Sequence, residues 1–471
     1  MTLTENKKIS LALFSFFLVF YTIQIPFHTS KPDIIVFAIR SMSEFPILDY
    51  AYLNSETLLH GTALPNHHLG HTIILWLMYK IVPTGLFNTI WPAGFVSAIS
   101  GALLISLTFS IWKSLDIEKY KAVTIAVVVG FIPSIWEHSI IGEVYVLQLL
   151  FILLFLYAFI KDRIILSSLA FMFANLVSPL SSLSFGLLLL KPFNKNTFKN
   201  AFITGGLALV LYLGVYGLIG SNLLDLFNPL NSEQEGRGFL YRSGMLIVFL
   251  TLNFNFFIFY LLKGFKFTYS NENRKFFYLI VATAPQLLLL FLGSTFFIEL
   301  GSFQLPIFWA LAFPLGLYIS QINIKKVPFV AASLGLVAVT YFMWILPNNS
   351  IGYSREEAGN WLKENGYQEN SVIGSWDISV GVLTGKNSYS LDVLNKYYFD
   401  QPCPTDDDIL KTEKEKLVIA EQKKIPLRVL LAELKIPGMG INVYEPEKEI
   451  KNGTVSKLYE NDAVLLYNWE K

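Results

Sequence analysis

Long uninterrupted apolar runs constrain the fold of this chain more than any other feature. Residues 144–160 and 201–219, for example, contain no charged side chain. An α-helix needs about 20 consecutive apolar residues to cross the hydrocarbon core of a bilayer. The candidate spans are residues 9–27, 91–112, 121–136, 144–160, 164–178, 180–190, 201–219, 241–262, 276–294, 303–320 and 327–346. They predict a polytopic α-helical membrane protein with about 11 transmembrane helices. Whether the short pair within 164–190 crosses fully is left open.

The composition agrees with a bilayer as the solvent for much of the chain. Hydrophobic residues make up 53% and charged residues 15%, against about 25% charged in an average soluble domain. These values exclude a soluble enzyme, a secreted disulfide scaffold and a disordered chain. The single cysteine, Cys403, excludes an internal disulfide and a cysteine-based metal cluster. The net charge of +1 argues against a nucleic-acid partner.

Charge divides the chain into two parts. Residues 1–346 hold 21 Lys and Arg with 15 Asp and Glu, whereas residues 347–471 hold 15 and 20. The second part is much shorter, so its charge density is far higher. The sequence therefore predicts a transmembrane domain over 1–346 and a water-soluble domain over 347–471.

Lysine and arginine predict the orientation, because they accumulate in cytoplasmic loops. With the N-terminus inside, the inner connectors carry 16 of these cations and the outer loops carry five. Eleven crossings then place the soluble domain outside, and we favour a bacterial plasma membrane over the endoplasmic reticulum. Residues 28–90 become a long first outer loop. Within it, residues 72–82 are too short to span and predict a re-entrant or interfacial helix, and residues 47–61 predict a second interfacial helix.

The soluble part has the pattern of an α/β domain. Ser354 and Glu357 fit a capping box that would open a helix through Asn365, stopping at Gly366. Residues 371–376, 416–420 and 463–468 predict strands. Residues 426–434, which begin with a proline, predict a second helix.

Histidines and acids gather where the outer face is predicted. All six histidines lie in the first 138 residues, and His67, His68 and His71 follow the carboxylates Asp49 and Glu56 along one loop. His67 and His71 are four residues apart, a spacing that can hold zinc. Because no HExxH motif is present, hydrogen bonding to a phosphate or sugar is the stronger hypothesis, beside interfacial histidines without a specific role.

Two further outer loops carry candidate groups. Glu137, His138 and Glu143 lie in a short loop, and Glu143 heads the fourth span, where a helix N-terminus tolerates a carboxylate. They are either the edge of an active site or structural. Arg237 and Arg242 stand in or next to the loop 220–240, where cations are scarce. Arginine binds phosphate through two parallel hydrogen bonds, although it also reaches lipid headgroups without a specific partner.

These motifs resemble the GT-C superfamily of polytopic glycosyltransferases, such as protein O-mannosyltransferases and lipid A aminoarabinose transferases. The resemblance rests on Asp49 in an Asp-x-x-Tyr…Leu-Leu-x-Gly frame, on His67-His68-Leu69-Gly70 before an apolar helix, on Gly142-Glu143-Val144-Tyr145-x-Leu, and on Ala358-x-x-Trp361-Leu362-Lys363-Glu364-Asn365 ahead of a strand. The prolines of the family's His-Pro-Pro element are absent. A late Arg-Tyr-x-x-Pro pattern appears only as Ser302-Phe303-Gln304-Leu305-Pro306, so its cation is missing.

The resemblance implies transfer of a sugar from a polyprenyl-phosphate donor to a protein, lipid or glycan acceptor at the outer face, with inversion. Asp49 is then the expected general base, and Glu143 the second catalytic carboxylate. His67, His68, His71, Glu56, Glu137, His138, Arg237 and Arg242 are the expected substrate-binding residues. The sequence specifies no cofactor and leaves a divalent cation open; membrane lipids are the other partners.

Two other classes compete with this reading. A transporter or flippase would place ionisable groups inside its spans, and these spans are nearly free of charge. A non-catalytic scaffold, whose outer domain binds a partner, also fits the sequence.

Overall fold

The structure is a computed structural model of the chain, and its described residues form two compact units. It describes residues 4–25, 68–82, 91–192, 194–219, 239–271, 273–292, 304–322, 335, 337–342, 346–367, 371–374, 388–390, 416–422, 454–462 and 464–470. The first unit contains Met1–Ile25, His67–Met78 and Pro92–Tyr341, and the second contains Phe342–Lys471 with Tyr79–Trp91.

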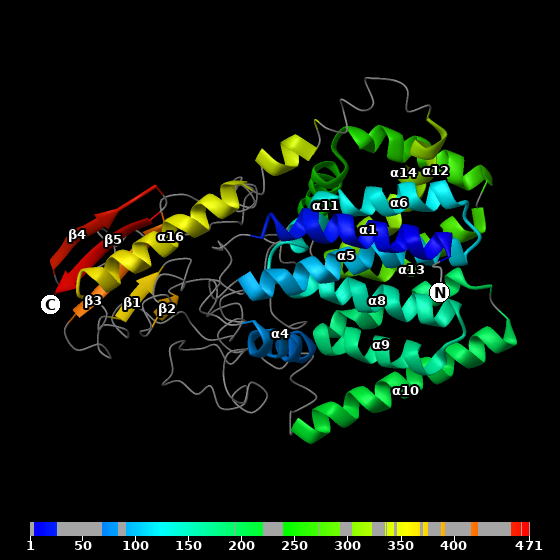
Figure 1. Cartoon of the computed structure of the whole chain (residues 1–471), viewed down its shortest axis with the longest axis horizontal. Helices are drawn as coiled ribbons and strands as arrows, with labels where there is room; N and C mark the ends of the chain where they lie inside the picture. Colours follow the sequence, from blue (N-terminus) through cyan, green and yellow to red (C-terminus); the bar gives the residue numbers. More distant parts are fainter. Residues whose placement is uncertain are drawn as a thin grey trace. The chain divides into compact units, whose positions relative to one another are not determined.

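The first unit is built from helices. They are α1 (Glu5–Thr22), α4 (Leu69–Ile81), α5 (Trp91–Ser114), α6 (Lys119–Gly130), α7 (Pro133–His138), α8 (Val144–Ile160), α9 (Ile164–Val177), η2 (Pro179–Leu190), α10 (Lys195–Ile219), α11 (Phe239–Phe254), η4 (Asn255–Phe257), α12 (Ile258–Asn271), α13 (Asn273–Leu292) and α14 (Leu305–Gln321) (Figure 1). α8 packs on α9, α9 on α10, α6 and α12 on α14, and η2 on α13.

Buried aromatic side chains join the end of α5 to α14. The ring of Trp112 stacks on Trp309 and Phe313, with centroid separations of 5.6 and 4.0 Å. Trp309 donates its indole N–H to the hydroxyl of Thr108 at 3.0 Å. Satisfying the indole in this way removes the cost of burying its N–H.

Three predicted spans have a different form. The run 121–136 is broken between α6 and α7, because Pro133 cannot continue the preceding helix and instead begins a new one. The run 241–262 is divided by η4 into α11 and α12. The run 180–190 lies in a 3₁₀ helix, η2, which begins at Pro179. Two helices in the described part of the chain, Trp91–Ser114 and Lys195–Leu218, are long and apolar enough to cross a membrane. The count of eleven spans stays a prediction.

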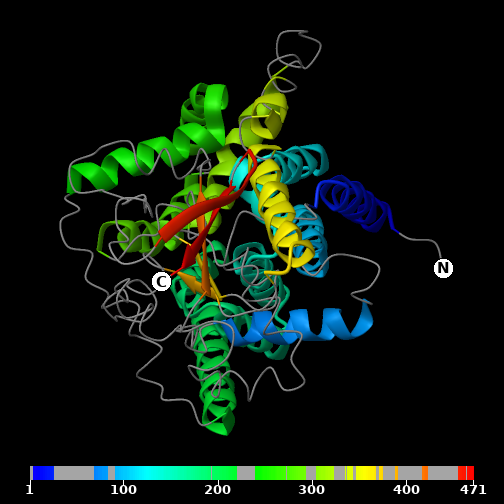
Figure 2. The same ribbon diagram turned by 90° about the vertical axis from the view of Figure 1, so that its left-hand side faces the viewer.

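The second unit contains α16 (Leu346–Glu364) and a five-stranded mixed sheet (Figure 2). The strands are β1 (Ser371–Gly374), β2 (Ser388–Ser390), β3 (Lys416–Gln422), β4 (Thr454–Glu460) and β5 (Val464–Glu470), in the order β2-β1-β3-β5-β4. β1 is parallel to β2 and β3, whereas β5 is antiparallel to β3 and β4. Ala358 and Leu362 of α16 are packed with Val464 and Leu466 of β5 in a small core.

The predicted capping box is wrong. α16 begins at Leu346, with Pro347 in its first turn, so Ser354 lies inside the helix and is buried. Proline is favoured in the first turn because it has no N–H to leave unpaired, which explains the earlier start. The predicted stop at Gly366 is confirmed: the helix ends at Glu364, and Gly366 has φ +85°. β1, β3 and β5 match predicted strands, while β2 and β4 were not predicted. The helix predicted over 426–434 and that over 47–61 lie outside the described residues.

Candidate functional site

A buried imidazole and a buried carboxylate face each other between α7 and α8. Nδ1 of His138 lies 3.6 Å from Oε2 of Glu143, and both side chains are almost fully inaccessible to solvent. The rings of Tyr145 and His138 meet edge to face, with centroids 5.1 Å apart and an interplanar angle of 72°. Glu137, one residue before the histidine, is also buried. Four residues of the predicted second outer loop and its edge therefore gather in the protein interior.

The local sequence fixes the chain on both sides of this pair. Pro133 starts α7, whose six residues end at His138. The N–H groups of Ile140 and Ile141 then donate to the carbonyl of Glu137 at 3.0 and 3.2 Å, which closes a tight turn. Glu143 follows in extended conformation as the N-cap residue of α8. The prediction that Glu143 heads the fourth span is confirmed. The prediction that Glu137 and His138 lie in a loop is wrong, because Pro133 starts a helix that includes both.

Small residues on α5 make room for this turn. Gly94, Ser97 and Gly101 share one helix face, since they are three and seven residues apart. A Cβ atom at Gly94 would come within 3.1 Å of the Ile140 carbonyl oxygen, and one at Gly101 would overlap the Ser139 hydroxyl. Ser97 donates its hydroxyl to the carbonyl of Glu143 at 3.5 Å. The turn therefore lies directly against the backbone of α5.

Asn253, at the end of α11, holds the start of α7 by a hydrogen bond. Its Oδ1 accepts the backbone N–H of Ser134 at 2.9 Å, and its Nδ2 donates to the carbonyl of Phe249 at 2.9 Å. The first N–H groups of a helix have no partner within the helix, so Asn253 acts as a cap supplied by another helix. It is buried, which keeps water from replacing it.

The chemistry of the pair follows from its burial. An ionised carboxylate removed from water costs several kcal/mol unless a charge or hydrogen bonds compensate it. At 3.6 Å the two groups are too far apart for a strong hydrogen bond but close enough for an ion pair when the imidazole is protonated. Small movements of either side chain would allow a proton to pass between them. Such a pair can position a hydroxyl group and accept its proton.

Two further histidines, His68 and His71, lie at the start of α4. His68 donates its Nδ1–H to the carbonyl of Val177, the last residue of α9, at 2.7 Å. A carbonyl can only accept, so this bond fixes the tautomer of a neutral His68 and leaves Nε2 as the acceptor. At Gly70 a Cβ atom would lie 3.0 Å from the backbone nitrogen of Val177, so the start of α4 touches the end of α9. The helix predicted over 72–82 is confirmed as α4.

His71 lies one turn further along α4 and is fully buried. Burial, helped by the neighbouring His68, lowers the pKa of His71 well below its usual value. This imidazole is therefore neutral at physiological pH rather than a cation. With 13 residues, α4 is about 20 Å long and is too short to span a bilayer.

The His138–Glu143 pair and the histidines of α4, His68 and His71, lie at the same end of the hairpin formed by α8 and α9. α8 and α9 pack against each other and are joined by residues 161–163 alone. The first turn of α8, which follows Glu143, is therefore at the same end as Val177, which His68 contacts. The three-residue connector is at the opposite end (Figure 1).

The remaining predicted site residues are not brought together by described contacts. Asp49, Glu56, His67 and Arg237 lie outside the described residues, and Arg242 is placed only as a backbone position in the first turn of α11. Within the described part of the chain, no group of three or more His, Cys, Asp and Glu side chains could hold a metal ion. The zinc hypothesis for His67 and His71 thus gains no support from the residues that are described.

Sequence reasoning missed the supporting residues Ser97 and Asn253, and it named Tyr145 only as part of the Gly142-Glu143-Val144-Tyr145-x-Leu motif. A signal existed for the first: small residues at 94, 97 and 101 on one face of an apolar helix are typical of close helix packing. Asn253 gave none, because a single asparagine in an apolar run does not reveal its partner.

No protein-family model matches the sequence, and no curated protein matches it. Solved structures do. The chain is similar to ArnT from Cupriavidus metallidurans bound to undecaprenyl phosphate, with 11% identity, 97% of each chain covered and a TM-score of 0.63. It is similar to the Archaeoglobus fulgidus oligosaccharyltransferase in its apo form, with 10% identity over 88% of this chain and 69% of that one, and a TM-score of 0.52.

A third similar structure is the mycobacterial arabinofuranosyltransferase AftD, at 13% identity and a TM-score of 0.51. The match covers 99% of this chain and 42% of that larger protein. At these identities the likeness establishes the fold. The chain therefore has the fold of the GT-C glycosyltransferases, and the resemblance predicted from its motifs is confirmed at that level.

Proposed function

We propose that this integral membrane protein transfers a sugar from a polyprenyl-phosphate donor to an acceptor at the outer membrane face. The observation that carries the proposal is the fold likeness to ArnT, which extends over 97% of both chains and whose structure holds undecaprenyl phosphate. A fold match that omits neither the helical part nor the C-terminal part is more informative than a match of the helices alone.

The helix ends of the first unit support the predicted side of the site. At one end Glu5 pairs with Lys119, and Lys275 donates its ammonium to the carbonyl of Leu115 at 2.7 Å. At the other end Trp136 donates its indole N–H to Gln24 at 3.0 Å, beside the His138–Glu143 pair. Cations of the predicted inner connectors thus meet at one end of the helices, and the candidate site is at the other.

The proposed chemistry uses carboxylates and neutral imidazoles. Polyprenyl phosphate is already a good leaving group, so only the acceptor hydroxyl needs a base. We assign that role to Asp49 and assign Glu143, with His138, to positioning the acceptor. The reaction is a single displacement with inversion. Arg237 and Arg242 are assigned to the donor phosphate, helped by hydrogen bonds from His67 and His71. Nε2 of His68 is assigned to accept from a hydroxyl of the donor sugar, with Glu56 and Glu137 toward the acceptor.

The first unit's buried ionic groups argue against a transporter. Among its described residues, the buried acidic and imidazole side chains are His71, Glu137, His138 and Glu143. All lie at helix ends. Transporters place such groups near the middle of the membrane, at the substrate pathway.

An assay of donor cleavage tests the proposal. Purified protein in nanodiscs should release polyprenyl phosphate from a labelled polyprenyl-phosphate sugar when acceptor is present. Asp49→Asn should slow release by about 10²–10⁴-fold, the usual contribution of a positioned base, while donor binding persists. Arg237→Ala or Arg242→Ala should weaken donor use. Intact lipid-linked sugar appearing in the opposite leaflet, without cleavage, would identify a transporter instead. If the donor is neither cleaved nor moved, the non-catalytic scaffold is the remaining hypothesis.

The proposed domains, 1–346 in the membrane and 347–471 outside, are tested with the single thiol. Cys403 should react with a membrane-impermeant maleimide in intact cells once the outer domain has been loosened by mild denaturant. Reaction only after the membrane is breached would place this domain inside and remove the outer-face assignment.

A further inference from the structure

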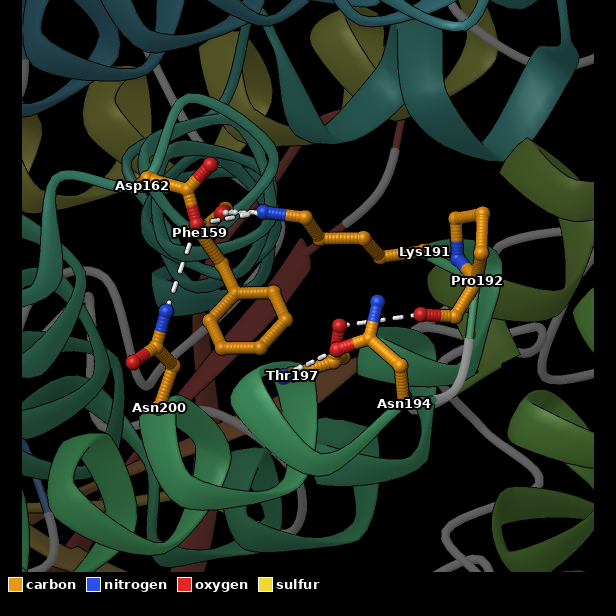
Figure 3. A network of polar contacts seen from close by, with 7 residues as sticks. All are labelled: Phe159, Asp162, Lys191, Pro192, Asn194, Thr197 and Asn200. Carbon is orange, nitrogen blue, oxygen red and sulfur yellow. Dashed lines mark hydrogen bonds and ion pairs between the residues drawn. The ribbon is translucent and has the colours of Figure 1, made fainter.

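The end of the helical unit opposite the candidate site carries a cluster of cations around one solvent-exposed ion pair. Asp162, in the connector between α8 and α9, binds the ammonium of Lys191 through Oδ1 at 2.5 Å. The same oxygen accepts the amide N–H of Asn200 in α10 at 3.3 Å. Figure 3 shows these two bonds converging on Asp162 from the η2–α10 segment.

This contact brings four further cations to one place. Lys161 and Arg163 flank Asp162 in sequence, Lys199 precedes Asn200, and Lys195 lies one turn before Lys199. All four side chains belong to exposed residues. Lys191 already balances the single negative charge of Asp162, so the other four cations are in excess. In the part of the chain that the structure describes, none of the four has an ion pair or a side-chain hydrogen bond.

The start of α10 is an unfavourable place for lysines. The positive end of the helix dipole disfavours cations in the first turn, and α10 has no acidic residue there to compensate. Asn194 caps the helix by accepting the N–H of Thr197 at 2.9 Å (Figure 3). Lys195, in the first turn, therefore raises the positive potential of this surface rather than stabilising the helix, and Lys199 in the next turn adds to that potential.

Exposed apolar side chains adjoin the cations. Phe202 is 75% exposed and lies three residues after Lys199, so the two share a face of α10. Ile165 is 70% exposed and lies two residues after Arg163. Exposed apolar side chains continue along α10 as far as Leu218. A cluster of cations next to exposed apolar side chains is typical of a helix that passes from the lipid headgroups into the hydrocarbon core.

We propose that Lys161, Arg163, Lys195 and Lys199 form a binding site for the phosphate headgroup of an anionic phospholipid, whose acyl chains lie along Phe202 and Ile165. Charge complementarity selects the headgroup, because four cations without counter-ions attract a phosphate more strongly than a zwitterionic lipid. The apolar neighbours select a lipid over a soluble phosphate. The assignment does not depend on the transferase reaction.

Native mass spectrometry of the full-length protein in detergent, titrated with phosphatidylglycerol, tests this site. Near a charged surface each cation contributes about fivefold, so K195Q/K199Q should weaken phosphatidylglycerol binding roughly 25-fold, while phosphatidylcholine binding is unchanged. The matched control is K119Q/K121Q, which removes two lysines that already pair with Glu5 and Glu118. It should retain the affinity of the wild type.

Three results would overturn the proposal. One is wild-type affinity in K195Q/K199Q, and another is equal loss in K119Q/K121Q, which would mean that only total charge matters. The third is binding of water-soluble glycerophosphoglycerol as tightly as the lipid, which would assign the cluster to a free phosphate ester. F202S should weaken the lipid and leave the soluble headgroup unaffected.

Discussion

Nδ1 of His138 lies 3.6 Å from Oε2 of Glu143 across the junction of α7 and α8, with both groups buried. The two residues are five apart in sequence: His138 ends α7, Glu143 is the N-cap of α8, and a tight turn lies between them. The separation is therefore set by the backbone, which is in turn held by α5 and by Asn253.

The first prediction concerns coupling within this pair. Glu143→Gln and His138→Gln should each reduce the rate of sugar transfer, and the double variant should lose little more than the worse single variant. Groups that act as one unit are strongly non-additive. Polyprenyl phosphate release by the three variants gives the comparison. Fully additive losses would contradict a joint role and leave each residue acting on its own.

The second prediction concerns the room that α5 leaves for the turn. Gly101→Ala should destabilise the protein by about 1–3 kcal/mol, because the added methyl group overlaps Ser139 and overpacks the core. The thermal midpoint in detergent measures this effect. The matched control is Gly214→Ala in α10, where nothing lies within 4 Å of the added Cβ; alanine there should be neutral or stabilising. A neutral Gly101→Ala would contradict the close contact.

The third prediction concerns the cap supplied by Asn253. Asn253→Ala should cost about 1–2 kcal/mol, as for loss of a helix cap, because the N–H of Ser134 loses its buried acceptor. Asn175→Ala is the matched control: Asn175 also donates to the carbonyl four residues earlier, Phe171, at 2.8 Å. Among the described residues, Asn175 makes no cross-helix bond of the kind that Asn253 makes to Ser134. Similar shifts in thermal midpoint for both variants would show that the cross-helix bond contributes nothing.

The fourth prediction concerns pH. Burial lowers the pKa of His71, so the unfolded chain binds a proton at about pH 6.5 while the folded imidazole stays neutral. Stability should therefore decrease as pH falls below that value, by up to about 1.4 kcal/mol per pH unit for this group. Thermal unfolding from neutral to mildly acidic pH should show a smaller decrease for His71→Gln than for the wild type. Identical pH profiles would contradict the lowered pKa.

The sequence alone determined the helical membrane class and the two-part charge distribution. Apolar runs such as Val144–Ile160 and Ile164–Val177 have few alternatives to a helix, since every backbone group in lipid must be satisfied internally. It also placed Glu143 at a helix start and Gly366 at a helix end. These features depend on neighbouring residues, which is why a linear reading succeeds.

Tertiary structure decided what the linear pattern could not. Both halves of the capping box were present at Ser354 and Glu357, yet packing on β5 and a proline at the first turn moved the start of α16 to Leu346. Asn253 and Gly101 became supports of the candidate site only through residues more than 35 positions away in sequence, Ser134 and Ser139. Hydrogen-bond partners and close backbone approaches are set by three-dimensional packing, so sequence spacing alone does not specify them.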